Sequence, residues 1–463
     1  MLVRRLSICS LTVFVLSACG HSSAPPVMAF QGSRVLAEKK PFGVNHRVPG
    51  SVVDGFESVP LPVQTKSGYL LLAGGTDGNV WFSDFDDNLV GYVNTSTHAY
   101  GTFVVPNDPN DGSSASPFAM RAANGTMYFG DSYGFGTAVQ SGVTLYNTEF
   151  FVNGGYYGGA NDSGDIAPVK NGSLYFGSHN PNAIGSQSTL WNAAPSSSPA
   201  QEIAPPNSTA NITNATLGSD GNIYFADLGN KSVGRYDVST GIIDTDKVQM
   251  PGKFTLGPSE NVYNGPDNYI WVCGLSGSAT QWIHINPSTL SSSVVISGFY
   301  HGGASCPNVN ADGAVSGSDS ALWWVTGGTI LQRVTNSTHQ YSTYDASVLG
   351  SDQGMESIAA GPDGNIWFYD DTNSVGVFHM QTISTMPASV RVAIGTSKTV
   401  SIAEVNYTGS FSLDAQSQCS GLAAVKKVSA NKFTVKGLAA GTCFLVFDDA
   451  LPMAKVYVLT KVT

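Results

Sequence analysis

Charged residues are scarce in this chain, at 12% of 463 residues, which leaves few positions for long, charged surface helices. Basic residues are the scarcer kind, with 22 lysines and arginines against 33 aspartates and glutamates, for a net charge of −11. Phosphate groups are repelled by such a chain, so we expect no nucleic-acid partner. The hydrophobic content of 42% nevertheless predicts a globular protein rather than a disordered one.

Several motifs that hold metals or nucleotides are absent. The chain has no CxxC pair, HExxH sequence, EF-hand loop or phosphate-binding glycine loop. Zinc, calcium and nucleotide sites therefore have no specific support from the sequence. Glycine is abundant, with 52 residues, and suits many short strands joined by tight turns. We expect an all-β chain with almost no helix.

The N terminus has the pattern of a targeting signal. Arg4 and Arg5 precede an apolar run over residues 6–16, which is too short to span a membrane. The following Leu16-Ser17-Ala18-Cys19 resembles the bacterial lipobox. The resemblance implies a signal peptide over 1–18, a lipid on Cys19, and a tether over 19–42 that anchors the protein extracytoplasmically to a membrane of the bacterial cell envelope. The alternative is an ordinary secretory signal with an incidental cysteine.

Four cysteines remain in an oxidising compartment, and two disulfides are possible. Cys419 and Cys443 lie in one small terminal region and enclose a loop of about 25 residues, for which chain entropy gives roughly 3 kcal/mol. Cys273 and Cys306 would join neighbouring repeats. Two separate buried thiols remain the alternative for this second pair, because spacing alone does not fix disulfide geometry.

One repeat dominates the middle of the chain, a turn followed by a short aromatic strand. Its successive positions are 44 to 52 residues apart, a period typical of radial arrays of small sheets. This predicts a seven-bladed β-propeller over 43–385. We expect the aromatics to fill the wedges between blades, and Asp84, Asp131, Asp227 and Asp370 to accept hydrogen bonds from the turns that follow them. The aromatics are Trp81, Tyr128, Tyr175, Tyr224, Trp271, Trp323 and Trp367.

The two ends of the repeat region suggest how the ring closes. The last repeat lacks an outer strand, whereas 54–62 carries the apolar-proline pattern of one. We therefore predict that 54–62 pairs with the last repeat and removes an exposed sheet edge. Residues 386–463 follow as a separate β-sandwich. Within them, 435–443 resembles a hairpin of bacterial immunoglobulin-like domains.

Two repeat copies carry a family resemblance. The repeats resemble those of the virginiamycin B lyase family of seven-bladed propellers, most clearly in residues 361–368 with 373–376 and in residues 217–225 with 230–235. The likeness extends over 54–383. The resemblance implies a lyase that opens a cyclic peptide ester with a divalent cation and a His and Glu pair at the central mouth. The family histidine typically stands eleven residues before the repeat aromatic. Here that register holds Glu260 and Glu356 instead.

A candidate catalytic group can still be assembled at the mouth. His301 lies between these two positions, so Glu260 and Glu356 could hold a divalent cation such as Mg²⁺ while His301 removes a proton. Solvated loop residues are the alternative for all three, and His284 and His379 are expected at the surface. Two functions remain open: a monomeric envelope protein that binds a small ligand, glycan or protein, and a metal-assisted carbon-oxygen lyase acting on a cyclic ester or polysaccharide.

Overall fold

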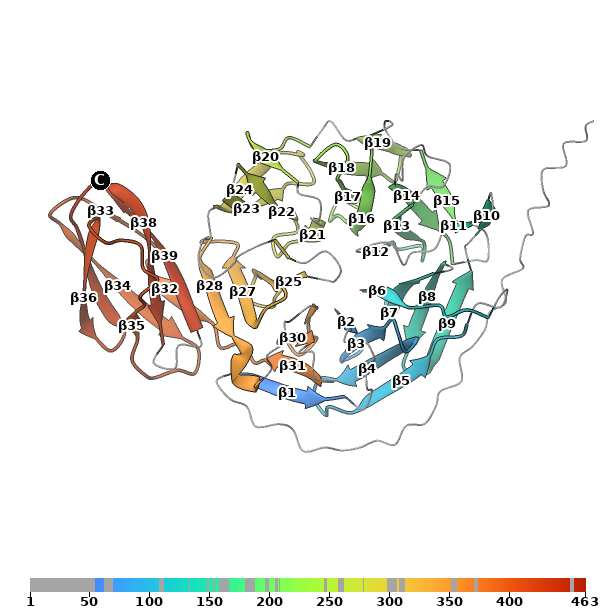
Figure 1. Ribbon diagram of the computed structural model, residues 1–463, viewed down its shortest axis with the longest axis horizontal. Coiled ribbons are helices and arrows are strands. Elements are labelled where there is room, and N and C mark those ends of the chain that lie inside the picture. Colours follow the sequence, from blue (N-terminus) through green and yellow to red (C-terminus); the bar gives the residue numbers. More distant parts are fainter. Residues whose placement is uncertain are drawn as a thin grey trace, which may run out of the picture.

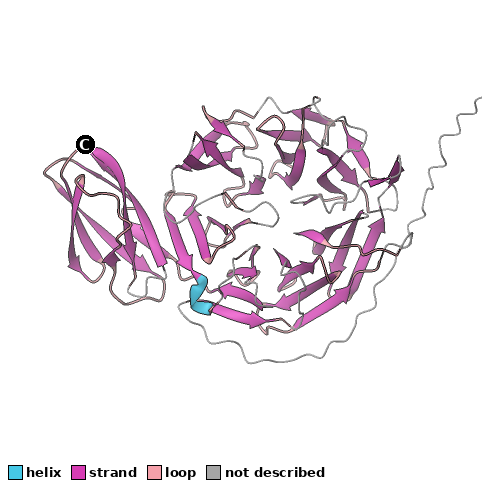
Figure 2. Ribbon diagram, viewed as in Figure 1, coloured by secondary structure: helices cyan, strands magenta, loops and turns pink. Residues whose placement is uncertain are grey.

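The computed structural model describes residues 55–61, 70–107, 112–132, 134–147, 150–152, 155–157, 166–179, 188–195, 200–204, 207, 209–244, 248–256, 262–277, 279–297, 306–307, 313–350, 355, 357–369, 374–449 and 454–463. The expected signal peptide, Cys19 and the tether lie outside these residues. Strands dominate the described residues, and a short 3-10 helix, η1, covers Ala346–Leu349 (Figure 2). The expected all-β class is therefore confirmed.

Antiparallel sheets follow one another around a ring in chain order (Figure 1). Each sheet is named here after its repeat aromatic. The Trp81 sheet contains β2 (Leu70–Gly74), β3 (Asn79–Asp84), β4 (Leu89–Asn94) and β5 (Tyr100–Val104). The Tyr128 sheet contains β6 (Phe118–Ala123), β7 (Thr126–Asp131), β8 (Gly134–Val139) and β9 (Gly142–Asn147). The Tyr175 sheet contains β12 (Ile166–Pro168), β13 (Leu174–His179), β14 (Ser188–Ala193) and β15 (Gln201–Ile203). A separate hairpin pairs β10 (Phe150–Val152) with β11 (Gly155–Tyr157).

The remaining sheets complete the ring. The Tyr224 sheet contains β16 (Ile212–Leu217), β17 (Ile223–Asp227), β18 (Ser232–Asp237) and β19 (Ile242–Asp244). The Trp271 sheet contains β20 (Phe254–Thr255), β21 (Val262–Asn264), β22 (Ile270–Ser276), β23 (Ala279–Ile285) and β24 (Ser292–Ser297). The Trp323 sheet contains β25 (Ala314–Ser316), β26 (Ala321–Trp324), β27 (Ile330–Thr335) and β28 (Tyr341–Asp345). The Trp367 sheet contains β29 (Ile358–Ala360), β30 (Ile366–Tyr369), β31 (Ser374–Phe378) and β1 (Phe56–Pro60).

The repeat aromatics form the packing between neighbouring sheets. Each is less than a tenth exposed, and each lies in a core cluster with apolar side chains of the next sheet. Trp367, for example, packs with Leu70, Leu72 and Phe82 of the Trp81 sheet. The aromatics therefore fill the wedges between sheets, as the sequence predicted, and stabilise the ring through burial.

Glycine is required at two kinds of position within a repeat. In the turn before the aromatic, Gly78 has a φ of +82°, a left-handed conformation that a glycine adopts without strain. On the third strand, a Cβ added to Gly91 would lie 2.2 Å from the Phe82 ring. The first glycine sets the hairpin, and the second leaves room for the ring of the neighbouring strand.

The ring closes through a strand from the beginning of the described chain. β1 pairs antiparallel with β31, with Phe56 opposite Phe378 and Pro60 opposite Ser374 (Figure 1). Phe56 is fully buried, and its ring centroid lies 4.9 Å from that of Phe378. β1 thus supplies the outer strand that the last repeat lacks.

The C-terminal residues form two packed sheets beside the ring (Figure 1). One sheet has the order β32 (Ile383–Met386), β34 (Ser397–Glu404), β37 (Lys432–Gly437) and β36 (Ala423–Ser429). The other contains β35 (Ser412–Leu413), β38 (Gly441–Asp448), β39 (Ala454–Val462) and β33 (Ser389–Val392). β39 also pairs antiparallel with β28, so this second sheet is continuous with the Trp323 sheet.

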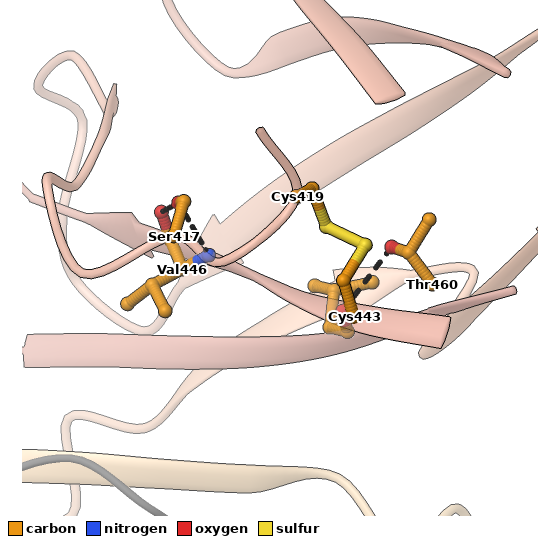
Figure 3. The surroundings of a disulfide bond; sticks show 6 residues. Ser417, Cys419, Cys443, Val446 and Thr460 are labelled. Carbon is orange, nitrogen blue, oxygen red and sulfur yellow. Dashed lines mark hydrogen bonds between the residues drawn. A yellow bond between two sulfur atoms is a disulfide. The ribbon is translucent and has the colours of Figure 1, made fainter. Parts of the chain in front are cut away.

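Both expected disulfides are present. Cys273 is bonded to Cys306, with Cα atoms 5.5 Å apart, and Cys419 to Cys443, with Cα atoms 5.2 Å apart. Figure 3 shows the second bond beside β38, where the Val446 backbone N–H donates to Ser417 Oγ over 3.0 Å. Within the described residues, no helix has the length and apolar character that a membrane span needs.

Candidate functional site

The predicted catalytic residues Glu260, His301 and Glu356 all lie outside the described residues. Glu260 and Glu356, the proposed Mg²⁺ ligands, are therefore outside them as well. The structure does show described residues close to them in sequence. Val262 is buried on β21, Cys306 is held by its disulfide, and Met355 and Ser357 are both buried. Ser357 Oγ accepts a hydrogen bond from the Leu72 backbone N–H over 2.8 Å, which links the Trp367 and Trp81 sheets.

Ionisable groups gather instead on the face that carries the repeat turns. Four residues before the aromatic, the turn aspartate accepts a hydrogen bond from the aromatic side chain. Trp271 Nε1 donates to Asp267 over 2.7 Å, and Trp323 Nε1 donates to Asp319 over 3.0 Å. The same contact joins Trp81 to Asp77, Tyr224 to Asp220 and Trp367 to Asp363. Besides forming the turn, the aspartate therefore fixes the aromatic ring.

In two sheets this aspartate also pairs with an arginine from the third strand, and in a third sheet it contacts a histidine from that strand. Arg333 Nε lies 2.6 Å from Asp319 Oδ2, and its guanidinium carbon is 5.6 Å from the centroid of the Trp323 ring. Arg235 Nε lies 3.7 Å from Asp220, and His284 Nδ1 lies 2.8 Å from Asp267. The shared arrangement is a carboxylate that faces a planar side chain of the third strand, and in the Trp323 sheet the aromatic ring also lies against the guanidinium.

His284 lies within the most developed of these groups. Its Nε2 is 2.6 Å from Ser293 Oγ, and its ring lies against that of His339 at 6.4 Å. Burial raises the pKa of Asp267, but hydrogen bonds from His284 and Trp271 outweigh this and leave the pKa below its usual value. Burial, together with the nearby His284, lowers the pKa of His339. His284 is therefore a half-buried paired residue and not the surface residue that the alternating pattern predicted.

A second histidine group lies where the ring closes. Glu57 of β1 is only 3% exposed, and its carboxylate lies 2.8 Å from His379 Nε2 and 3.5 Å from His98 Nδ1. The His98 ring meets Trp367 edge-on, with centroids 6.0 Å apart. The His379 side chain is one-third exposed, which is closer than His284 to the surface position expected for both histidines. The group links the closing strand to the segment after β31 of its own sheet, through His379, and to the Trp81 sheet, through His98.

Two of the four aspartates that stand three residues after an aromatic, Asp84 and Asp227, bind the turns that follow, as predicted. Asp84 Oδ1 accepts hydrogen bonds from the Asp86 and Asp87 backbone N–H groups over 3.2 and 3.1 Å. Asp227 Oδ1 accepts from the Asn230 backbone N–H over 3.1 Å. Asp84 is fully buried, and this burial raises its pKa to about 6. Asp370 lies outside the described residues.

The described residues contain no group of three His, Cys, Asp or Glu side chains arranged to hold a metal ion. Their aspartate and histidine groups can orient cations and exchange protons. Sequence reasoning missed the pairing of turn aspartates with arginine and histidine side chains of the third strand. Its signal is an aspartate four residues before the aromatic combined with Arg or His on the third strand, which is recognisable only after strand register is known.

A ring of antiparallel sheets with aromatic residues packed between them defines the chain as a β-propeller. Solved structures with this fold include a streptogramin B lyase, 20% identical, covering 70% of this chain and 96% of the other, with a TM-score of 0.51. A catalytically inactive virginiamycin B lyase from Staphylococcus aureus, solved with quinupristin, is 18% identical, covers 70% and 98%, and also has a TM-score of 0.51.

The resemblance to virginiamycin B lyase seen in the repeats is thus confirmed as a likeness in fold. Identities of 18 to 20% establish the fold alone. No protein-family model matches the chain. A search among curated proteins likewise gives no match.

Proposed function

We propose that this protein is a lipid-anchored, extracytoplasmic propeller of seven blades with an immunoglobulin-like C-terminal domain, and that it binds a small ligand, glycan or protein partner in the bacterial cell envelope. Seven repeat aromatics support the blade count, because each lies in its own sheet. The two-layer C-terminal sheets support the second domain. Two disulfides support an oxidising compartment, and the lipobox-like Leu16-Ser17-Ala18-Cys19 supports the anchor.

One observation favours binding over catalysis. The lyase family resemblance places a histidine eleven residues before the aromatic, whereas this chain has Glu260 and Glu356 there. A carboxylate at this position can accept hydrogen bonds from hydroxyl or amide groups of a ligand, but at neutral pH it is a weaker base than an imidazole. Carboxylates at these two positions therefore favour a central mouth that recognises polar groups over one that removes a proton.

The anchor is tested by expressing the full chain and Cys19→Ala in a bacterium fed with radiolabelled palmitate. We expect the wild-type protein to carry the label and to fractionate with membranes, and the Cys19→Ala variant to do neither. Cys9→Ala is the matched control and should behave like the wild type. Label that persists in Cys19→Ala, or a wild type that is unlabelled and soluble, would contradict the anchor.

Binding at the mouth is tested with the full chain on an array of envelope glycans and peptidoglycan fragments. We expect saturable binding to at least one class, weakened at least tenfold by Glu260→Ala together with Glu356→Ala. Lys253→Ala, an exposed substitution in the Trp271 repeat, is the control. Absence of saturable binding to every class, or equal binding by the double variant, would argue against this function.

The second candidate is a metal-assisted carbon-oxygen lyase that uses Glu260, His301 and Glu356. It is favoured by the likeness to lyase structures, one of which was solved with quinupristin. The test is opening of the quinupristin ring, followed by mass spectrometry with Mg²⁺ or with EDTA. Turnover that requires Mg²⁺ and is lost in His301→Ala would establish the lyase and displace the binding proposal, whereas no turnover by the wild type would remove quinupristin as its substrate.

A further inference from the structure

The seam between the Trp81 and Tyr128 sheets differs from two other seams of the ring. Elsewhere, the turn between the third and fourth strands of a sheet places an imidazole on the preceding sheet. His98, from the turn over residues 95–99, lies against Trp367, and His339, from the turn over 336–340, lies against His284. The corresponding turn of the Tyr128 sheet consists of Gln140 and Ser141 alone, between β8 and β9. This short turn brings no imidazole to the seam.

A cavity of about 130 Å³ opens at this seam. Asp77, Thr76 and Trp81 line it from the Trp81 sheet, and Ala122, Met127 and Gln140 line it from the Tyr128 sheet. An engineered protein cavity of about 150 Å³ holds one benzene molecule, so this space fits a planar group of comparable size. The cavity lies on the turn face and is lined by none of the residues proposed for the central mouth.

The charge of Asp77 at this cavity has no cationic partner from the third strand. At the position of Arg333 and His284 in their sheets, the Trp81 sheet has Tyr92, whose ring packs on Trp81 with centroids 5.1 Å apart. Asp77 is exposed, and its carboxylate accepts hydrogen bonds from the Asn79 backbone N–H over 3.3 Å and from Asn79 Nδ2 over 2.8 Å. It also accepts from Trp81 Nε1 over 3.2 Å and from Gln140 Nε2 over 3.4 Å. The pair of carboxylate and indole thus recurs from the Trp323 sheet without a guanidinium. Tyr92 takes the place of Arg333 against the ring, and the cavity opens beside the carboxylate.

We propose that the cavity formed by Asp77, Trp81 and Gln140 is a binding site for a guanidinium group, supplied by a small molecule or by an arginine side chain of a partner. The Trp323 sheet provides the precedent within the same molecule, because its Asp319 and Trp323 hold the guanidinium of Arg333 at 2.6 and 5.6 Å. A guanidinium is planar and donates hydrogen bonds from several N–H groups, so it matches both a carboxylate and an amide oxygen.

The site is tested by saturation-transfer NMR with the full chain, using N-methylguanidinium and the blocked peptide acetyl-Gly-Arg-Gly-amide as separate probes. We expect saturable binding of at least one probe, with a dissociation constant on the order of 1 mM for so small a ligand. Binding of the free guanidinium alone indicates a small-molecule site, whereas much tighter binding of the peptide indicates an arginine from a partner. The same blocked peptide with citrulline in place of arginine has a neutral side chain and should not bind.

Two variants make the test specific. Asp77→Asn removes the charge and should weaken binding at least tenfold, and Gln140→Arg supplies a guanidinium from the protein itself and should block the site. Asp363→Asn, the same turn position in the Trp367 sheet, should bind like the wild type. Melting temperatures within a few degrees of the wild type would show that the variants are folded. Failure of both probes to bind the wild type, or equal binding by Asp77→Asn, would overturn the proposal.

Discussion

The outer edges of two neighbouring sheets show different uses of strand pairing. In the Trp367 sheet, β1 comes from the start of the described chain and supplies a fourth strand that the repeat lacks. In the Trp323 sheet, the repeat already has four strands, and β39 of the C-terminal region adds a fifth against β28. One pairing closes the ring, whereas the other continues a sheet of the ring into the next domain.

The difference shows what strand pairing does for each part. Without β1, the edge of β31 would expose backbone donors and acceptors and the apolar Phe378. Without β39, β28 would be an ordinary outer strand, and the ring would still be closed. We therefore expect the β1 pairing to contribute to the stability of the ring, and the β39 pairing to couple the two domains.

The largest effect should come from the closing strand. Phe56→Ala removes a fully buried ring that packs against Phe368 and Phe378, which should lower the free energy of unfolding by about 3 to 5 kcal/mol. Urea unfolding followed by tryptophan fluorescence measures this change. Pro60→Ala, at the exposed end of the same strand, is the control. A loss below about 1 kcal/mol in Phe56→Ala would mean that β1 does not support the ring.

The disulfides test how far the two domains unfold together. Replacing Cys419 and Cys443 by Ser opens a loop with a sequence separation of 24 and should cost about 3 to 4 kcal/mol. If β28 and β39 couple the domains, calorimetry should show one transition that moves to lower temperature. The matched change at Cys273 and Cys306, with a separation of 33, should have a similar cost. A shift confined to a separate C-terminal transition would contradict coupling.

Asp84 is a buried carboxylate that lies at neither of these two sheet edges, and it should make the stability of the fold depend on pH. Because burial raises the pKa of Asp84 to about 6, the folded chain binds more protons here than the unfolded chain between pH 4 and 6. Stability therefore falls as pH rises through this range, by at most about 3 kcal/mol. Asp84→Asn, which keeps an acceptor oxygen, should flatten this fall in urea titrations at several pH values. Identical slopes for variant and wild type would show that Asp84 contributes nothing.

The smallest expected effect concerns the junction itself. Tyr457 of β39 lies against Tyr341 of β28, with ring centroids 4.7 Å apart. Tyr457→Ala should cost about 2 kcal/mol and separate the thermal transitions of the ring and the C-terminal domain. Leu459→Ala, which removes an exposed side chain of the same strand, should leave the transitions together. Transitions that stay merged in Tyr457→Ala would assign the coupling to other contacts.

The same comparison explains what the sequence could predict. A repeat with a missing strand is visible in sequence, because the other copies show what is absent, and 54–62 carries the matching proline pattern. The pairing of β28 with β39 adds to a complete repeat, so no gap marks it. The repeat aromatics were predictable from the period of the repeat, and the Cys419–Cys443 bond from the small region that holds both cysteines. The Cys273–Cys306 bond stayed open until the structure was known, because spacing alone does not fix its geometry. The Asp319 and Arg333 pair was not predictable, because residues 14 apart meet only through the register of β26 and β27.

The position of β1 has a mechanical consequence. β1 is the first strand of the described chain, so with the proposed lipid anchor at Cys19 a pull on the N terminus would reach the closing strand before any other described strand. The antiparallel ladder with β31 must resist that load across five residue pairs, from Phe56 to Pro60. Under the proposed anchoring, the strand that seals the ring would therefore also be the first described strand to carry tension between the membrane and the propeller.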